Sequence, residues 1–257
     1  MDREYKYIYG PVPSWRLGSS LGIDPVSKKE KICTFDCIYC QLGRARSVGG
    51  ERRTFVPVSG IISELTSLPS LHIDYITFSG TGEPTLAENL GDMIRAVRHV
   101  RPEKIAVLTN STMMHDPGVI RDLALSDLVV CKLDASSQAL FELINRPAEG
   151  IDINAIVNAI KGFKDHYKGK LALQVMFMEE NKMCAEGIAR IAKEIAPDEV
   201  QLNTPLRPCG IRPLAKEEMN GIEEHFHGLK TVSVYRADKK SVDPISSKET
   251  LKRRGKV

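Results

Sequence analysis

Three cysteines stand within eight residues of this chain. They are Cys33, Cys37 and Cys40, separated by three and then by two residues. Thiolates this close on one segment are suited to share a metal site. A closed site needs a fourth ligand, but the next cysteine is Cys131 and the nearest downstream histidine is His72. The spacing therefore predicts three protein ligands and one open coordination position, with a structural zinc loop as the alternative.

A second motif, residues 79–84, reads Ser-Gly-Thr-Gly-Glu-Pro and closes a short apolar run. Gly80 and Gly82, on either side of Thr81, let the backbone turn sharply and approach a ligand closely. Glu83 either contacts that ligand or supports the loop. An ordinary turn is the alternative to a ligand site.

Polar side chains follow three other apolar runs, where a packed core would exclude them. They are Asn110, Lys132, Asp134 and Asn203. If these runs are parallel strands, their carboxyl ends share one edge, where such groups can contact a ligand. The alternatives are an internal ion pair between Lys132 and Asp134, and helix capping by Asn110 and Asn203.

The remaining cysteines have separate interpretations. Strand alternation places Cys131 on the face opposite Lys132 and Asp134, so we expect it to be buried among apolar residues. Cys184 lies at a predicted helix start, where a thiol becomes more acidic, and Cys209 lies in the loop after the sixth predicted strand. Both could face the mouth of the fold as neighbours. They are the candidate catalytic thiols, as a hydrogen-atom donor or resolving pair, with inert thiols or an auxiliary cluster as alternatives.

Short β-branched runs alternate with stretches of helical periodicity, the pattern of parallel strands joined by helical crossovers. Six such units predict an α/β fold, an open partial (βα)6 barrel whose reactive rim lies at the carboxyl ends of the strands. The cysteine loop then follows the first strand. Strands are expected at 21–24, 75–79, 104–109, 128–133, 171–177 and 200–202, with a possible edge strand at 231–235. Helices are expected near 60–68, 89–100, 117–125, 153–166, 184–195 and 215–226.

Composition and charge set the broad class. Of the 257 residues, 42% are hydrophobic and 27% charged, as in ordinary soluble proteins. Since neither a signal peptide nor an apolar run of roughly 20 residues is visible, we expect a cytoplasmic protein without membrane contact. The net charge is +3, but residues 236–257 carry eight Lys or Arg against three Asp or Glu, which is +5 and leaves −2 elsewhere. We therefore divide the chain into a barrel core, 1–235, and a basic tail, 236–257, that is solvated or contacts a polyanion.

The cysteine spacing, with Tyr39 just before the last cysteine, resembles the signature of radical S-adenosylmethionine (SAM) enzymes. The resemblance implies a 4Fe-4S cluster on Cys33, Cys37 and Cys40, with one iron left free to chelate SAM. It also implies reductive cleavage of SAM to a 5′-deoxyadenosyl radical that abstracts hydrogen from a substrate. An electron donor of the flavodoxin or ferredoxin type is the expected partner.

The same resemblance implies further cofactor contacts. The family's glycine motif, which accepts hydrogen bonds from the SAM ammonium, matches Gly80 to Glu83. The fourth strand of the family helps hold the ribose or carboxylate of SAM, a role that carries over to Asp134 and also to Lys132. Asn110 and Asn203 are further candidate contacts because they are polar residues at strand ends. The Tyr39 ring would shield the cluster from water or simply pack in the core.

A closer resemblance runs through residues 8 to about 209. It is to the radical SAM group of iron-sulfur oxidoreductases related to the tRNA wyosine (4-demethylwyosine) synthases. Two features separate this chain from the archaeal wyosine synthases: no cysteine precedes Cys33, and Trp15 stands where an arginine is expected. The motifs that carry the resemblance are at 10–18, 20–25, 33–40, 78–86, 132–135, 145–147 and 201–205.

Three substrate classes follow as hypotheses. The basic tail and the wyosine-synthase resemblance favour an RNA base. The acidic body and short chain favour a small molecule or nucleotide in a closed pocket. The third is a partner polypeptide that the protein would activate. Arg146, Arg207 and Arg212 are the best candidates to meet a phosphate or carboxylate, since guanidinium groups suit both.

Overall fold

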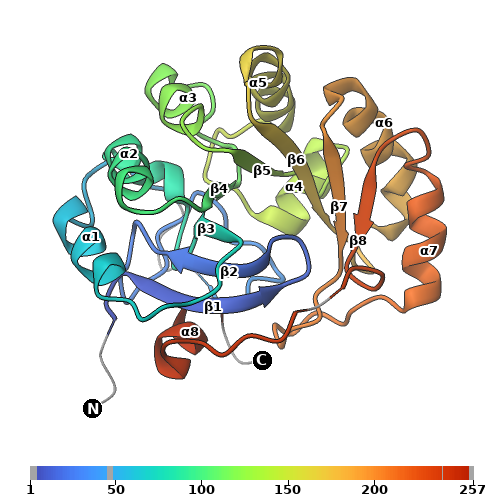
Figure 1. Ribbon diagram of the computed structural model, residues 1–257. Helices are drawn as coiled ribbons and strands as arrows, with labels where there is room; N and C mark the ends of the chain where they lie inside the picture. The colour runs from blue at the N-terminus through green and yellow to red at the C-terminus, as the bar shows by residue number, and fades with distance from the viewer. Residues whose placement is uncertain (1–4, 45–48, 239, 255–257) are drawn as a thin grey trace.

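One curled sheet of eight strands forms the centre of the molecule, with its strands in chain order from β1 to β8 (Figure 1). The computed structural model describes residues 5–44, 49–238 and 240–254. Strands β2 to β8 are parallel, and β1 pairs antiparallel with β2 at the edge. The strands are β1 (Ile8–Ser14), β2 (Gly18–Ile23), β3 (Tyr75–Phe78), β4 (Lys104–Thr109), β5 (Leu128–Lys132), β6 (Lys170–Met176), β7 (Glu199–Asn203) and β8 (Thr231–Ser233).

Most helices lie on the convex side of the sheet, as Figure 1 shows for α2, α3, α5 and α6. Each connects two parallel strands, which is the expected crossover arrangement. The helices are α1 (Val58–Thr66), α2 (Leu90–Val100), α3 (Pro117–Leu123), α4 (Gln138–Asn145), α5 (Ile153–His166), α6 (Ala185–Ile195), α7 (Lys216–Glu224) and α8 (Ser247–Arg254), with short 3-10 turns η1 (Pro84–Leu86) and η2 (Lys182–Cys184).

The two faces of the sheet bury different residues because side chains alternate along each strand. In β5, Val129 and Cys131 join the large core between sheet and helices. Leu128 and Val130 point to the concave side, where a small cluster with Leu17 fills part of the interior. Polar side chains share this side, since the hydroxyls of Ser20 and Thr77 are bonded at 2.7 Å and Lys132 and Asn203 stand at the carboxyl ends of β5 and β7.

The fold confirms the predicted α/β class, an open partial barrel, and six of its parallel strands lie where the sequence placed them. The edge strand β8 is also present. The cysteine loop, however, follows the second strand, because β1 was missed. The two prolines of β1, Pro11 and Pro13, disfavour a central strand but are tolerated at a sheet edge.

The C-terminal segment differs from the solvated tail expected for 236–257. Helix α8 packs against β1, and its Arg253 is only 2% exposed. The Arg253 guanidinium pairs with the buried carboxylate of Asp24, with Nε and Oδ2 3.1 Å apart. Residues 247–254 are therefore part of the folded body, whereas 239 and 255–257 lie outside the described residues.

Candidate functional site

The cysteine loop is held from both sides by backbone hydrogen bonds. On one side, Ile32 donates to the Thr81 carbonyl (3.3 Å) and accepts from the Glu83 amide (2.9 Å). On the other side, the amides of Asp36 and Ile38 donate to carbonyls at the end of α4, at 3.0 and 2.9 Å. The loop is thus fixed between the glycine motif and α4, two segments far from it in sequence.

The two glycines of the motif are required by close contacts. A Cβ at Gly82 would lie 1.9 Å from the Ile32 carbonyl oxygen, so a side chain there would separate the motif from the cysteine loop. Gly80 has a φ of +139°, and a Cβ there would lie 2.4 Å from the Asp24 carboxyl carbon. Asp24 Oδ2 also accepts hydrogen bonds from the amide and hydroxyl of Thr81 (3.2 and 2.9 Å).

Glu83 supports the loop rather than presenting its carboxylate to a ligand. Its Oε1 accepts from the amide and hydroxyl of Thr85 and from the Thr109 hydroxyl, and its Oε2 accepts from the Asn110 amide at 2.8 Å. Burial raises the pKa of Glu83, although these donors lower it in part. Of its two predicted roles, the geometry favours the supporting one.

Side-chain amides donate to two of the three thiols. Asn110 Nδ2 lies 3.6 Å from Cys33 Sγ and 2.7 Å from Thr34 Oγ1. Asn145 Nδ2 lies 3.4 Å from Cys37 Sγ. Asn110 therefore holds the cysteine loop instead of capping a helix. Asn145 was not assigned a role from the sequence, although the motif at 145–147 had been noted there.

The three half-buried cysteines fit an iron-sulfur cluster by donor type and surroundings. Amide donors to sulfur are a common means of tuning such a cluster. Burial lowers the pKa of Lys31, but the neighbouring Cys40 and Cys33, together with the Asp36 carboxylate, raise it overall. Lys31 Nζ lies 3.1 Å from Asp36 Oδ1 within the cysteine loop. Among the described residues no three His, Cys, Asp or Glu side chains converge as the ligands of a single ion do.

Asp134 is fully engaged by protein groups. Its carboxylate accepts from the Tyr39 hydroxyl, from Asn145 Nδ2 (2.8 Å) and from the Met176 amide (2.8 Å), and it pairs with Lys132 Nζ at 3.3 Å. The Lys132 ammonium also lies 4.9 Å from the centre of the Tyr39 ring. This geometry matches the internal ion pair rather than direct contact of Asp134 with a cofactor. Burial, followed by the Asp134 charge, raises the pKa of Tyr39 well above its usual value.

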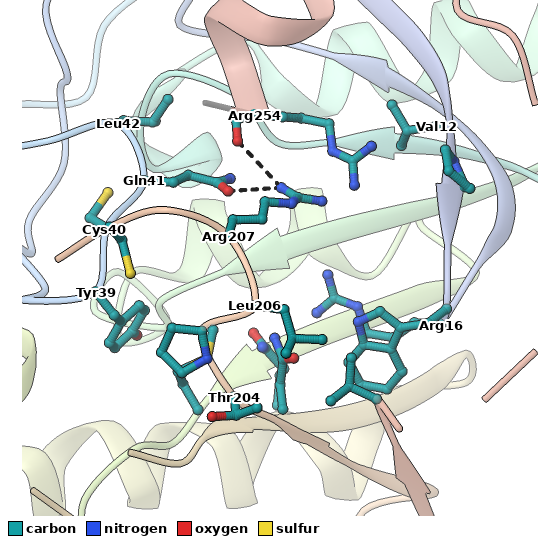
Figure 2. A pocket seen from close by; sticks show the side chains of 18 of the residues that line it. Val12, Arg16, Tyr39, Cys40, Gln41, Leu42, Thr204, Leu206, Arg207 and Arg254 are labelled. Carbon is teal, nitrogen blue, oxygen red and sulfur yellow. Dashed lines mark hydrogen bonds between the residues drawn. The ribbon is translucent and has the colours of Figure 1, made fainter. Parts of the chain in front are cut away.

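A cavity of about 730 Å³ opens beside the cysteine loop on the concave side of the sheet (Figure 2). Tyr39 and Cys40 form one wall, and Lys132 and Asn203 contribute from the ends of β5 and β7. Helix α8 supplies another part of the wall through Ser247, Thr250, Leu251 and Arg254. The fold therefore brings together six residues singled out from the sequence around one space, since Arg207 and Cys209 line it as well.

The candidate thiols are not both at this cavity. Cys209 lines it, whereas Cys184 is not among its lining residues and stands at the N-cap position of α6, where its side chain makes no capping hydrogen bond. The expectation that both face the mouth as neighbours is therefore wrong for Cys184. Cys131 is fully buried beside Met114, as expected.

Two further residues, Asp24 and Arg16, have contacts in the structure that the sequence did not suggest. Asp24 joins the glycine motif to α8, and Arg16 points into the cavity. Both lie inside motifs noted in the sequence, but an isolated charged residue gives no local signal of its distant partner.

Comparison with known families identifies the chemistry. The sequence model described as "Radical SAM superfamily" matches residues 31–192, more than half of the chain. This chain belongs to the radical SAM superfamily. Membership confirms the two predicted cofactors, SAM and the 4Fe-4S cluster that is characteristic of the superfamily, and confirms that the protein is of an enzyme family.

Relatives of this radical SAM protein include the UPF0026 protein slr1464 of Synechocystis. The two are 38% identical over 218 residues, which is 84% of this chain and 81% of the relative. A "Probable GTP 3′,8-cyclase" of Saccharolobus islandicus is 22% identical over 205 residues, covering 79% of this chain and 63% of that protein.

Solved structures share the fold of this radical SAM protein at low sequence identity. Archaeal TYW1 has a TM-score of 0.58 at 12% identity, with 85% of this chain and 74% of that chain covered. Native anSMEcpe with bound AdoMet has a TM-score of 0.61 at 19% identity, with 84% and 64% covered. No helix in the described part of the radical SAM chain is long and apolar enough to cross a membrane.

Proposed function

We propose that the protein is a SAM-cleaving enzyme in which Cys33, Cys37 and Cys40 hold the 4Fe-4S cluster and the cavity holds a small-molecule or nucleotide substrate. When bound together, the cluster and SAM supply a 5′-deoxyadenosyl radical that abstracts hydrogen from the substrate. The observation that carries this proposal is the cavity wall, where Cys40 and Tyr39 stand beside the polar ends of β5 and β7.

Residues of the chain orient the cysteine loop and SAM and keep water away from them. Asn110 and Asn145 hold the loop through hydrogen bonds to Cys33 and Cys37. The backbone of Gly80 to Glu83 is assigned to the SAM ammonium, because its glycines let the turn approach a ligand closely. The Thr81 and Glu83 carbonyls already accept from the amides of Ile32 and Leu86, so the Gly80 and Gly82 carbonyls are the proposed acceptors. The Tyr39 ring, fixed through Asp134, excludes water from the adjacent sulfur.

The size of the cavity favours a small substrate. Pockets for small molecules occupy roughly 300–1,000 Å³, and this cavity of about 730 Å³ lies within that range. Asn203 and Gln174 in its wall can form hydrogen bonds to a substrate, while Trp15 and Leu206 provide apolar surface. A flavodoxin- or ferredoxin-like protein is the proposed donor of the electron that cleaves SAM. Hydrogen abstraction from the substrate serves several enzyme classes, and oxidoreductase is one of them.

The test is anaerobic reconstitution followed by reduction with dithionite in the presence of SAM. We expect a brown protein that releases 5′-deoxyadenosine. Cys37→Ala should lose most of its iron and all detectable release, because only two thiols of the loop remain. Mass spectrometry of products from a cell extract would then identify the substrate.

The matched control is Cys184→Ala, which removes a half-buried thiol away from the cysteine loop. It should keep the iron content and chromophore of the parent protein. Zinc in place of iron, or equal iron in Cys37→Ala and the parent, would contradict the proposal.

A further inference from the structure

The cavity is lined by four basic side chains and by no carboxylate from the described residues. Lys132 is one of them, and it is already paired with Asp134. The other three are Arg16, Arg207 and Arg254, and no ion pair joins Arg16 or Arg207 to a carboxylate in the described part of the chain. These three side chains are half-buried, and cations withdrawn from water in this way are normally paired, so the cavity carries an excess of positive charge.

Arg16 has the least satisfied environment of the three. Its Nε and Nη1 are buried and have no hydrogen-bond partner, and its guanidinium lies 5.2 Å from the centre of the Trp15 ring. Burial lowers the pKa of Arg16 to about 10, with a further contribution from the Arg207 charge. Arg16 is therefore still protonated at neutral pH, and unmatched donors of this kind are costly to bury.

Arg207 and Arg254 reach the same space from other parts of the fold (Figure 2). Arg207 Nη1 donates to Gln41 Oε1 at 2.8 Å and to the Arg254 carbonyl at 3.5 Å, which connects the loop after β7 to the end of α8. Burial also lowers the pKa of Arg207. Three guanidiniums from the β1–β2 turn, the β7 loop and α8 thus surround one volume, and their mutual repulsion falls when an anion lies among them.

We infer that Arg16, Arg207 and Arg254 bind an anionic group of the substrate, a phosphate or a carboxylate. The inference rests on the proposed function, since it names the class of substrate for that same cavity. Guanidinium groups bind both anions through paired N–H donors. Figure 2 shows Cys40 and Tyr39 on one side of the cavity and Arg16 on the other, with Arg207 bonded to Gln41 next to the cysteine loop, so an anion held among the arginines lies within reach of that loop.

Binding to the anaerobic holoenzyme tests this directly. Pyrophosphate and malonate are titrated by calorimetry with SAM at saturation, and the emission of Trp15, the only tryptophan of the chain, serves as a second signal from the cavity wall. At least one probe should bind. Preference for pyrophosphate would assign the site to phosphate, and preference for malonate would assign it to carboxylate.

Substitutions test whether these arginines, and not other cations nearby, bind the probe. In Arg16→Gln and in Arg254→Gln, affinity for the preferred probe should fall roughly tenfold to a hundredfold, since each loses one charged hydrogen-bond donor. Arg212→Gln is the matched control, because Arg212 is exposed in the same loop as Arg207 and does not line the cavity. It should bind like the parent protein.

Thermal stability distinguishes an anion-binding role of Arg16 from a purely structural one. Removing an unpaired buried charge should leave the melting temperature of Arg16→Gln unchanged or higher, whereas loss of a structural contact would lower it. A lower melting temperature together with unchanged probe affinity in both variants would overturn the inference. Equal loss of SAM binding in Arg16→Gln would also overturn it, because the arginines would then serve SAM.

Failure of this inference is distinguishable from failure of the proposed function. Dithionite-driven release of 5′-deoxyadenosine without any added probe reports on SAM cleavage alone. If the parent protein cleaves SAM but binds neither pyrophosphate nor malonate, the anion site is refuted and the proposed function stands. If it binds a probe but does not cleave SAM, the proposed function fails instead.

Discussion

At the scale of single residues, Asp134 shows how a buried carboxylate can organise a site without contacting the reacting groups. It is 3% exposed, and its partners come from the cysteine loop, β5, α4 and the end of β6. Three of these partners, Tyr39, Lys132 and Met176, line the cavity. The Lys132 charge stabilises the carboxylate, and the Tyr39 hydroxyl fixes the ring beside Cys40.

We expect Asp134→Asn to destabilise the protein by about 3 kcal/mol, because it leaves the mostly buried Lys132 ammonium without its counter-charge. The Tyr39 ring should also be held less firmly. Urea unfolding measured side by side with the parent protein tests the change in unfolding free energy.

Asp92→Asn is the control for this change. Asp92 pairs with Arg95 on the exposed face of α2, with side chains 64% and 59% exposed, so its loss should alter stability by less than about 0.5 kcal/mol. Equal effects of the two substitutions would show that the buried pair contributes no more than a surface one.

At the scale of elements, α8 is connected to the glycine motif through a chain of hydrogen bonds. Arg253 Nε donates to Asp24 Oδ2, which in turn accepts from Thr81. Asp24 is fully buried, so the guanidinium neutralises a charge that would otherwise be isolated in the core. The C-terminal helix thereby supports a loop assigned to SAM.

Arg253→Met should lower the unfolding free energy by about 3 kcal/mol or more, since it leaves the Asp24 carboxylate buried and unpaired. It should also weaken SAM binding several-fold, because Thr81 loses a rigid acceptor. Calorimetric titration of SAM into the reconstituted protein, together with thermal unfolding, measures both effects.

The neighbouring Lys252→Met provides the comparison. The Lys252 side chain is 44% exposed, and its pair with Glu249 spans 3.6 Å. Stability and SAM affinity should both stay close to those of the parent. Unchanged SAM binding in Arg253→Met, despite lower stability, would refute the link from α8 to the glycine motif.

At the scale of the whole molecule, several cations of residues 236–257 are paired with carboxylates, and Arg254 lines the cavity. The described pairs are Arg236 with Glu223, Lys240 with Asp74, Lys252 with Glu249 and Arg253 with Asp24. In the described part of the segment these pairs offset some of the positive charge, which argues against RNA binding through it.

We therefore expect only weak binding of bulk tRNA to the reconstituted protein. Filter binding across a series of salt concentrations should give a shallow dependence, equivalent to about three phosphate contacts or fewer. A steep dependence that is lost when residues 236–257 are removed would instead support an RNA substrate and contradict this expectation.

The sequence alone determined the local features of this protein. Cysteine spacing, strand alternation and helical periodicity act over a few residues, so the superfamily, the α/β class and six parallel strands could be predicted from it. Strand β1 was missed because its prolines obscure the pattern, and α8 because its composition is that of a solvated tail.

Only the tertiary structure decided which distant residues meet. Asn145 reaches Cys37 across 108 residues, and Arg253 reaches Asp24 across 229. The arginines at the cavity likewise come from the first strand pair, the β7 loop and the last helix. No local periodicity encodes such contacts, because they arise only when the curled sheet brings its two ends and the C-terminal helix around one space.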